Sequence, residues 1–365
     1  MVKRQSNFEL LRIVAMLMII FHHFACHGGF IWDFSTITIE HLWYNLIIMG
    51  GKIGVNIFVL ISGYFLIVNK DKIVNLFRKM LKLWGQISFY SLLFFVMGGA
   101  YNFKALIESL FPIIFSKWWF CSTYFVLYLL HPFLNILLNK LNKKQYQLLL
   151  FGLIFIWSII PTFTTSSFQS NNLLWFISLY VFAGYIRLYG LNKKFNTKTY
   201  FYFWLLFSVL TYLTSVILMY FGTKNIPLAS SRVTYFYDLN TISVLLISLS
   251  LFMLFLNLKI NYHKNINLVA STTFGIYLIH DSDLIRYFLW LDLFKNASYQ
   301  NSLLLIPYSI VVVLVVFIVC FIVDLIRQKT IEKLYMKFVD KYIDDILKFF
   351  RKIYLFFRNI VFGQD

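Results

Sequence analysis

The segment from Arg12 to His27, RIVAMLMIIFHHFACH, combines an apolar helical pattern with an arginine and three histidines. Ionisable side chains inside a membrane cost on the order of several kcal/mol, so they mark a candidate functional site with a partner to be found. Arg12 and His23 are 11 residues apart, so in an α-helix they share one face at a separation of about 16 Å. Glu9 lies one turn before Arg12 and is placed to pair with it. The segment predicts a polar stripe that faces a bundle interior or a water-filled cavity.

These residues leave three interpretations of His23 open. It is a general base for a reacting hydroxyl, a structural histidine bonded to a neighbouring helix, or a metal ligand. The metal interpretation uses His23 with His27 and His22 with Cys26, because the members of each pair are four residues apart. No carboxylate-rich second half of a metal site accompanies the cluster in the sequence. We therefore expect no metal.

Composition places these residues in a membrane protein. The 365 residues are 60% hydrophobic and only 13% charged, which excludes a soluble domain of ordinary composition. The first apolar run is too long for a signal-peptide core, so we expect no cleavable signal. Runs of about 17 to 25 apolar residues predict an all-α, polytopic transmembrane helical bundle. The ten expected spans are residues 8–28, 44–68, 81–99, 118–139, 146–162, 172–190, 199–221, 238–258, 268–290 and 303–326.

The net charge of +18 is concentrated in short loops and near the C-terminus. Basic connections such as NKLNKKQ and RLYGLNKKFNTK alternate with connections such as TFTTSSFQSNN, which contain no Lys or Arg. By the positive-inside rule this predicts that both termini are cytoplasmic. Such clusters face an anionic lipid bilayer, so we expect no nucleic-acid partner.

The pattern changes after residue 326. Residues 327–365 repeat apolar positions at helical spacing among many Lys and Arg, which predicts a basic amphipathic helix on the cytoplasmic leaflet. We expect two parts: a membrane-embedded domain at 1–326 and this cytoplasmic tail at 327–365.

Four segments carry a resemblance to a known family: FELLRIVAMLMIIFHHF, GVNIFVLISGYFLI with the basic RKMLK that follows it, WWFCSTYFVLYLLHPFLN, and TTFGIYLIH. Their order and spacing resemble the acyltransferase 3 family of integral-membrane acyltransferases, best known for O-acetylating bacterial surface polysaccharides. The resemblance extends over residues 8–326. Two positions depart from the family pattern: Asn56 stands where many relatives carry Asp, and His131 precedes Pro132 where relatives more often carry a neutral residue.

The resemblance implies an O-acyltransferase of a bacterial cell membrane. It would move an acetyl group from cytoplasmic acetyl-CoA to a hydroxyl of a cell-surface polysaccharide or its lipid-linked precursor, with no permanently bound cofactor. Arg12 and His23 would be the essential catalytic pair. His23 would act as the base or as a covalent acyl carrier, and Arg12 would bind a phosphate or the pantetheine arm of the donor.

Other residues are assigned with alternatives. Arg78, Lys79 and Lys82 would meet the nucleotide phosphates of the donor, or else they are only a topology signal. His280 would bind the acceptor or orient His23, or else it is a polar group near the outer interface. Ser62 would offer a hydroxyl to substrate, or else it is a small packing residue.

A different class of function is also compatible with the sequence. A transporter or flippase for lipid-linked glycans would share the ten spans, the intramembrane charges and the basic inner face, but the sequence shows no paired repeats with broken helices. Acetyl-CoA distinguishes the two functions, because a transporter has no need of it.

Overall fold

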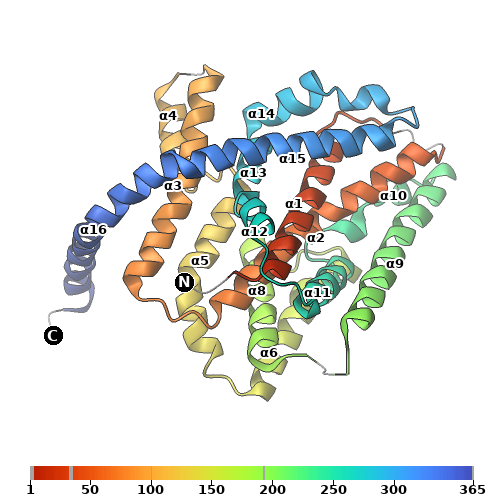
Figure 1. Cartoon of the computed structure of the whole chain (residues 1–365). Coiled ribbons are helices and arrows are strands. Elements are labelled where there is room, and N and C mark those ends of the chain that lie inside the picture. The colour runs from red at the N-terminus through yellow and green to blue at the C-terminus, as the bar shows by residue number, and fades with distance from the viewer. Residues whose placement is uncertain (1–3, 33–35, 100, 192–193, 364–365) are drawn as a thin grey trace. The chain divides into compact units, whose positions relative to one another are not determined.

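A computed structural model describes residues 4–32, 36–99, 101–191 and 194–363, and its regular elements in these ranges are all helices (Figure 1). Nine helical stretches of the described chain are long and apolar enough to cross a membrane. The predicted all-α transmembrane bundle is thereby confirmed. The described residues form two compact units, one within 1–68 and 118–321 and the other within 69–117 and 322–365. We call them the main unit and the second unit.

The main unit holds most of the helices. In chain order these are α1 (Ser6–Cys26), α2 (Ile39–Leu66), α5 (Trp119–Leu138), α6 (Lys143–Ile154), the π-helical turn η1 (Phe155–Ile159), α7 (Ile160–Thr164), α8 (Asn172–Tyr189), α9 (Thr197–Thr223), α10 (Pro227–Ser230), the 3-10 turn η2 (Tyr235–Tyr237), α11 (Ile242–Asn257), α12 (Lys264–Ala270), α13 (Thr273–His280), α14 (Asp283–Tyr287), the π-helical turn η3 (Phe288–Leu293), the 3-10 turn η4 (Asn296–Tyr299) and the first part of α15 (Leu305–Lys329).

Glycines hold α1 and α2 together. A Cβ atom on Gly54 would lie 2.7 Å from the carbonyl oxygen of Ala15, and one on Gly51 would lie 2.2 Å from the ring of His22. Both distances are too short for real atoms, so only glycine allows the backbones to approach this closely. These two contacts fix the rotation of α1 against α2 between Ala15 and His22 of α1.

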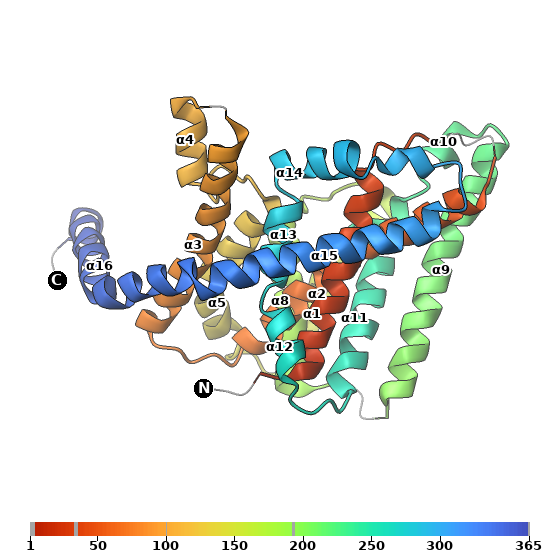
Figure 2. The same ribbon diagram turned by 45° about the horizontal axis from the view of Figure 1, so that its top comes forward.

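One hydrogen bond shows the relative direction of α1 and α11. Asn7, near the start of α1, donates from Nδ2 to the carbonyl oxygen of Phe255 near the end of α11, at 2.9 Å. α1 and α11 are therefore antiparallel. Figure 2 shows α10 and α14 at the end of the unit where α1 terminates. We call this the His23 end.

Two connections lie where the sequence predicts. The basic α11–α12 connection lies at the end opposite to the His23 end (Figure 2). The α7–α8 connection, which contains no Lys or Arg, lies beside the segment between α10 and α11, because Nδ2 of Asn240 donates to the hydroxyl of Ser170 at 3.4 Å. The chain alternates between two ends as a polytopic protein must. Which end faces the cytoplasm stays a prediction.

The expected span at 268–290 is interrupted in the structure. α12 ends at Ala270, α13 begins at Thr273 and ends at His280, and α14 follows. The break has a local cause, because hydroxyls of Ser271 and Thr272 bond the carbonyls three residues earlier, both at 2.7 Å, and compete with helix continuation. His280 therefore lies at the C-terminal end of a short helix instead of inside a long one.

His131 has a structural role in α5. Pro132 has no N–H and cannot donate to the carbonyl four residues earlier, which belongs to Tyr128. Nδ1 of His131 lies 2.5 Å from that carbonyl oxygen and donates to it. The histidine thus satisfies the group that the proline frees, and it accounts for this departure from the family pattern.

Asn56 connects three parts of the main unit and is fully buried. Its Nδ2 donates to the carbonyl oxygen of Leu239 at 3.1 Å, and its Oδ1 accepts from Nε1 of Trp175 at 3.0 Å. An aspartate could accept from Trp175 but could not donate to Leu239. The amide at this position is therefore matched to its surroundings.

The second unit contains α3 (Ile73–Gly98), α4 (Phe103–Leu110), the last part of α15 and α16 (Ile331–Phe362). Met336, Val339 and Ile343 of α16 form a small core against Phe77 and Leu81 of α3. Other large side chains of α16 are exposed, among them Phe349, Phe350, Tyr354, Phe356 and Phe357. The expected C-terminal amphipathic helix is confirmed, whereas its contact with lipid and the domain boundary at 326 stay predictions.

Candidate active site

A pair of histidines from α1 and α13 forms the centre of the site. Nδ1 of His23 lies 2.9 Å from Nε2 of His280, and Nδ1 of His280 lies 2.6 Å from the carbonyl oxygen of Ile276. A carbonyl can only accept, so in the neutral pair Nδ1 of His280 carries its proton and Nε2 is the acceptor. His23 must then donate from Nδ1. This chain of bonds leaves the lone pair of His23 on Nε2.

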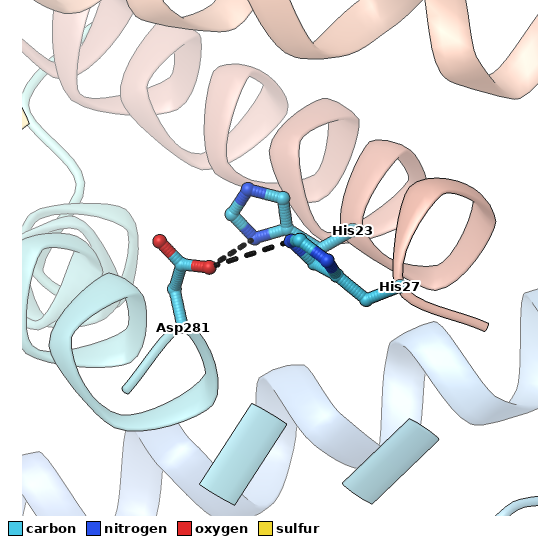
Figure 3. Close-up of side chains that lie close together, drawn as sticks. All are labelled: His23, His27 and Asp281. Carbon is cyan, nitrogen blue, oxygen red and sulfur yellow. Dashed lines mark ion pairs between the residues drawn. The ribbon is translucent and has the colours of Figure 1, made fainter. Parts of the chain in front are cut away.

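A carboxylate lies beside the two α1 histidines. Oδ1 of Asp281 is 3.6 Å from Nδ1 of His23 and 3.8 Å from Nε2 of His27 (Figure 3). The Asp281 side chain is only 8% exposed, and Nη1 of Arg286 lies 3.5 Å from the same oxygen. In this low-dielectric setting the carboxylate favours a positive charge on His23 when that ring takes up a proton.

An apolar cavity opens next to His23. It is lined by His22, His23, Gly51, Lys52 and aromatic residues that include Phe58, Trp119, Phe120 and Phe274. His22 does not offer a free nitrogen through Nδ1, because that atom lies 2.7 Å from the carbonyl oxygen of Ile48. No described residue hydrogen-bonds Nε2 of His23, so this nitrogen is the basic group left for a molecule in the cavity.

Lys52 is a site residue that our sequence analysis missed. It lies in the middle of α2, lines the cavity with His23, and its Nζ is 5.6 Å from the centre of the Trp119 ring. The sequence does contain a sign of this role, because the lysine is a charged residue that interrupts an apolar run through most of α2. An ammonium group beside a base in an apolar cavity can stabilise negative charge that develops on a substrate.

In the structure, the carboxylate of Asp281 joins the histidine cluster, which the sequence did not predict. Ligand atoms of His23, His27 and Asp281 lie within 4.8 Å of one another, a spacing that a metal ion could bridge. However, Nη1 of Arg286 lies at the same carboxylate oxygen and opposes a second cation. We interpret the group as a charge-coupled histidine pair, and the expectation of no metal stays a prediction.

Comparison with known families decides the class of the protein. A family model described as an acyltransferase domain, that of the acyltransferase 3 family, matches residues 5–325. The chain belongs to the acyltransferase 3 family. No curated protein and no solved structure gives a significant match. The match and the apolar helices together make this a multi-pass membrane acyltransferase.

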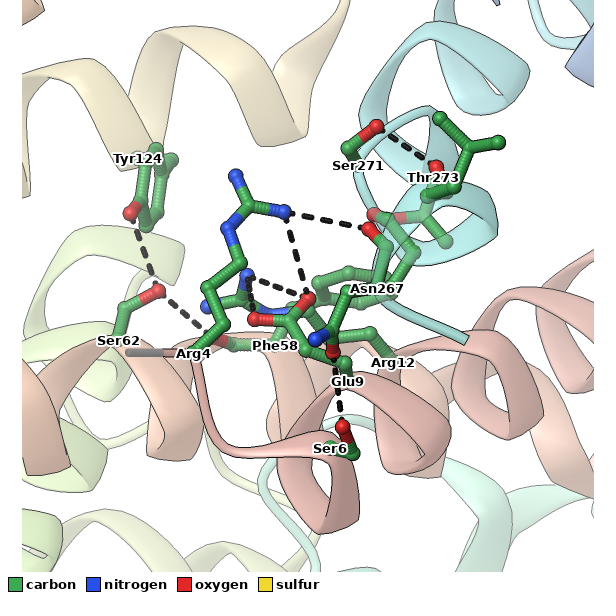
Figure 4. A network of polar contacts seen from close by, with 12 residues as sticks. Arg4, Ser6, Glu9, Arg12, Phe58, Ser62, Tyr124, Asn267, Ser271 and Thr273 are labelled. Atoms are coloured by element: carbon green, nitrogen blue, oxygen red, sulfur yellow. Dashed lines mark hydrogen bonds and ion pairs between the residues drawn. The ribbon is translucent and has the colours of Figure 1, made fainter. Parts of the chain in front are cut away.

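Arg12 lies at the other end of α1 of the acyltransferase, away from His23. Its Nη1 is 3.4 Å from Glu9, which confirms the pairing that the sequence predicted (Figure 4). Nη1 of Arg4 lies 3.9 Å from the same Glu9 carboxylate and 3.4 Å from the carbonyl oxygen of Asn267. Arg12 and His23 therefore share α1 without touching each other, and the Arg12 side chain keeps 27% of its surface exposed.

Ser62 of the acyltransferase has two hydrogen-bonding partners. Its hydroxyl donates to the carbonyl oxygen of Phe58 at 2.8 Å and accepts from the hydroxyl of Tyr124 at 3.0 Å (Figure 4). These bonds join α2 to α5. The packing alternative has direct support from these contacts, and a substrate-binding role for Ser62 stays a prediction.

The three basic residues assigned to the donor belong to the second unit, and each has a carboxylate partner. Arg78 bonds Asp340 through Nε at 2.5 Å and Nη2 at 2.9 Å, and Nζ of Lys82 lies 2.6 Å from Glu332. Lys79 pairs with Asp71. In the structure, Arg78 and Lys82 attach α16 to α3, and their binding to a nucleotide stays a prediction.

Proposed function

We propose that this acyltransferase moves an acetyl group from acetyl-CoA to a hydroxyl of a cell-surface polysaccharide or its lipid-linked precursor. We place it in a bacterial cell membrane with both termini in the cytoplasm. The main support is His23, because its tautomer is fixed through His280 and its Nε2 is left without a partner among the described residues. A base with a defined free lone pair in an apolar cavity is what hydroxyl activation needs.

The proton and charge movements follow from this arrangement. The acceptor hydroxyl attacks the thioester carbonyl carbon while Nε2 of His23 takes the hydroxyl proton. Lys52 stabilises the tetrahedral oxyanion, and Asp281 stabilises the imidazolium, 3.6 Å away. The C–S bond then breaks, and the leaving thiolate of CoA receives the proton from His23.

A covalent route uses the same atom of His23. Nε2 attacks the thioester carbonyl carbon, the C–S bond breaks and CoA leaves as the thiolate, which gives an acyl-imidazolium with the proton still on Nδ1. In a second step the acceptor hydroxyl attacks the acyl carbon, the C–N bond breaks to regenerate neutral His23, and the CoA thiolate takes up the hydroxyl proton. The two routes differ in one observable, which is an acetylated enzyme that forms without acceptor. Rapid mixing with labelled acetyl-CoA, followed by denaturation near neutral pH and immediate separation of protein from CoA, distinguishes them.

The donor would approach from the side of Arg12. The guanidinium of Arg12 pairs with Glu9 and is partly exposed, so its remaining N–H groups can bind a phosphate or the pantetheine arm. We assign Arg78, Lys79 and Lys82 to the nucleotide phosphates, which would have to displace their present carboxylate partners.

The test is transfer of labelled acetyl from acetyl-CoA to glycan in membranes that contain the protein. We expect wild type to label the native glycan and His23→Ala to lose the label. His263→Asn is the matched control, because His263 is an exposed N-cap residue of α12 and asparagine also caps helices. Full transfer by His23→Ala would contradict the assignment of the base. Absence of label from wild type, with native glycan supplied, would reject acetyl-CoA and this glycan as the donor and acceptor pair.

A further inference from the structure

A polar cleft lies in the main unit, at the His23 end, and is distinct from the apolar cavity. It is formed by the α7–α8 connection, the start of α8 and the segment that leads into α11. Its lining consists of Pro161, Thr165, Ser166, Ser167, Ser170, Asn171, Asn172, Trp175, Tyr235, Asp238, Leu239, Asn240 and Thr241. Hydroxyl and amide groups dominate, with two aromatic rings and one carboxylate.

Asn56 of α2 links the lining of the cleft to the part of α2 that lines the His23 cavity. Asn56 accepts a hydrogen bond from Trp175 and donates one to Leu239, and both of these residues line the cleft. Val55, the residue before Asn56, lines the cavity. The two spaces are therefore connected through the packing of one segment of α2.

Several polar groups of the cleft are not used by the fold. Among the described contacts, the side chains of Ser167, Asn172 and Asp238 have no hydrogen bond to another residue, and all three are exposed. By contrast, Asn171 caps α8 at Leu174, and Asn240 donates to the carbonyl oxygen of Trp157. The unused hydroxyl, amide and carboxylate can each bond a ligand hydroxyl.

The charge of the lining selects the class of ligand. None of the described residues in it is Lys or Arg, and Asp238 would repel a phosphate or uronate group. Amide and hydroxyl groups beside Trp and Tyr rings suit a neutral sugar, which presents hydroxyls at its edges and C–H groups on its faces.

The backbone of the cleft rim supports a specific function. Thr165, Phe168 and Gln169 have φ angles of 60°, 44° and 62° in a segment without glycine. Non-glycine residues in this left-handed region are strained and collect at binding sites. Local bonds hold the segment, including Phe168 N–H to the hydroxyl of Ser166 at 3.2 Å.

We propose that this cleft binds a neutral sugar unit of the acceptor, next to the unit that receives the acyl group. The role of the cleft in acyl transfer rests on the proposed function, whereas its ability to bind a neutral sugar does not. The cleft would recognise the glycan chain, and the cavity would hold the reacting hydroxyl beside His23.

The experiment measures glycan binding without chemistry. Surface glycan from the source organism is separated by anion exchange into neutral and acidic fractions, and each is titrated onto the full-length protein in nanodiscs. We expect the neutral fraction to bind wild type, and the Ser167→Ala/Asn172→Ala variant to raise the Kd about tenfold. Ser231→Ala, an exposed α10 flank residue outside the cleft, is the matched control.

The outcomes separate the two proposals. Unchanged affinity in the cleft variant, or binding of the acidic fraction alone, would overturn the cleft assignment even if acetyl transfer is found. Loss of neutral-glycan binding in the cleft variant, together with no acetyl transfer by wild type, would support the cleft and reject the acyltransfer. Because Ser167 and Asn172 are exposed, we expect the cleft variant to fold like wild type. A thermal melt of each variant checks this and excludes unfolding as the cause of lost binding.

Discussion

Nε2 of His280 lies 2.9 Å from Nδ1 of His23, and the carbonyl oxygen of Ile276 lies 2.6 Å from the other nitrogen of His280. Because a backbone carbonyl fixes the first proton, each ring in turn has only one neutral tautomer available. The broken helix α12–α13 is what brings this relay to α1. We therefore propose that His280 acts on His23 as a positioning residue.

Replacement of His280 should lower turnover without weakening acceptor binding. His280→Leu removes the acceptor of the His23 Nδ1 proton, so the ring loses its orientation, and we expect kcat to fall about tenfold or more with KM for glycan unchanged. His280→Gln keeps an acceptor oxygen and should restore part of the rate. A rise in KM at constant kcat would instead indicate that His280 contacts the acceptor. Steady-state transfer assays at saturating acetyl-CoA distinguish these results.

Removal of the Lys52 ammonium should impair the chemical step. Lys52→Met keeps an unbranched side chain that is one atom shorter and removes its charge, and loss of an oxyanion-stabilising group costs about 100-fold to 1000-fold in kcat. Lys52→Arg should retain more activity than Lys52→Met. Lys104→Met, on the exposed helix α4, controls for the loss of one positive charge. Equal rates for Lys52→Met and wild type would remove Lys52 from the mechanism.

Sequence patterns predicted the bundle because apolar runs and basic loops are local signals. They also predicted the pairing of Glu9 with Arg12, which depends only on helical spacing. The contact of His23 with His280 spans 257 residues, and no local spacing reports it. The break between α12 and α13 was missed because its Ser and Thr residues are compatible with a membrane helix. Lys52 was missed although it interrupts an apolar run, because its place beside His23 and Trp119 depends on contacts between segments that are distant in sequence.

Asn56→Asp should destabilise the protein. The new carboxylate cannot donate to the carbonyl of Leu239, and two buried acceptors would face each other. We expect a loss of about 1 to 3 kcal/mol in the free energy of unfolding. Thermal unfolding in detergent, read by the fluorescence of buried tryptophans, measures it. Asn225→Asp, in the exposed turn after α9, is the matched substitution and should leave the melting temperature nearly unchanged.

The donor assignment predicts opposite effects for two variants of one ion pair. If Arg78 binds a CoA phosphate, Arg78→Ala should raise KM for acetyl-CoA about tenfold, because a charge-assisted contact is lost. Asp340→Asn should lower the same KM, because it frees the guanidinium from its present partner. The structural alternative makes a different prediction, since both variants would then loosen α16 from α3 to a similar extent and leave the KM for acetyl-CoA alone. The exposed pair contributes little to stability, so both variants should fold. Donor titrations at fixed glycan, compared with wild type, decide whether Arg78 serves the donor or only the helix contact.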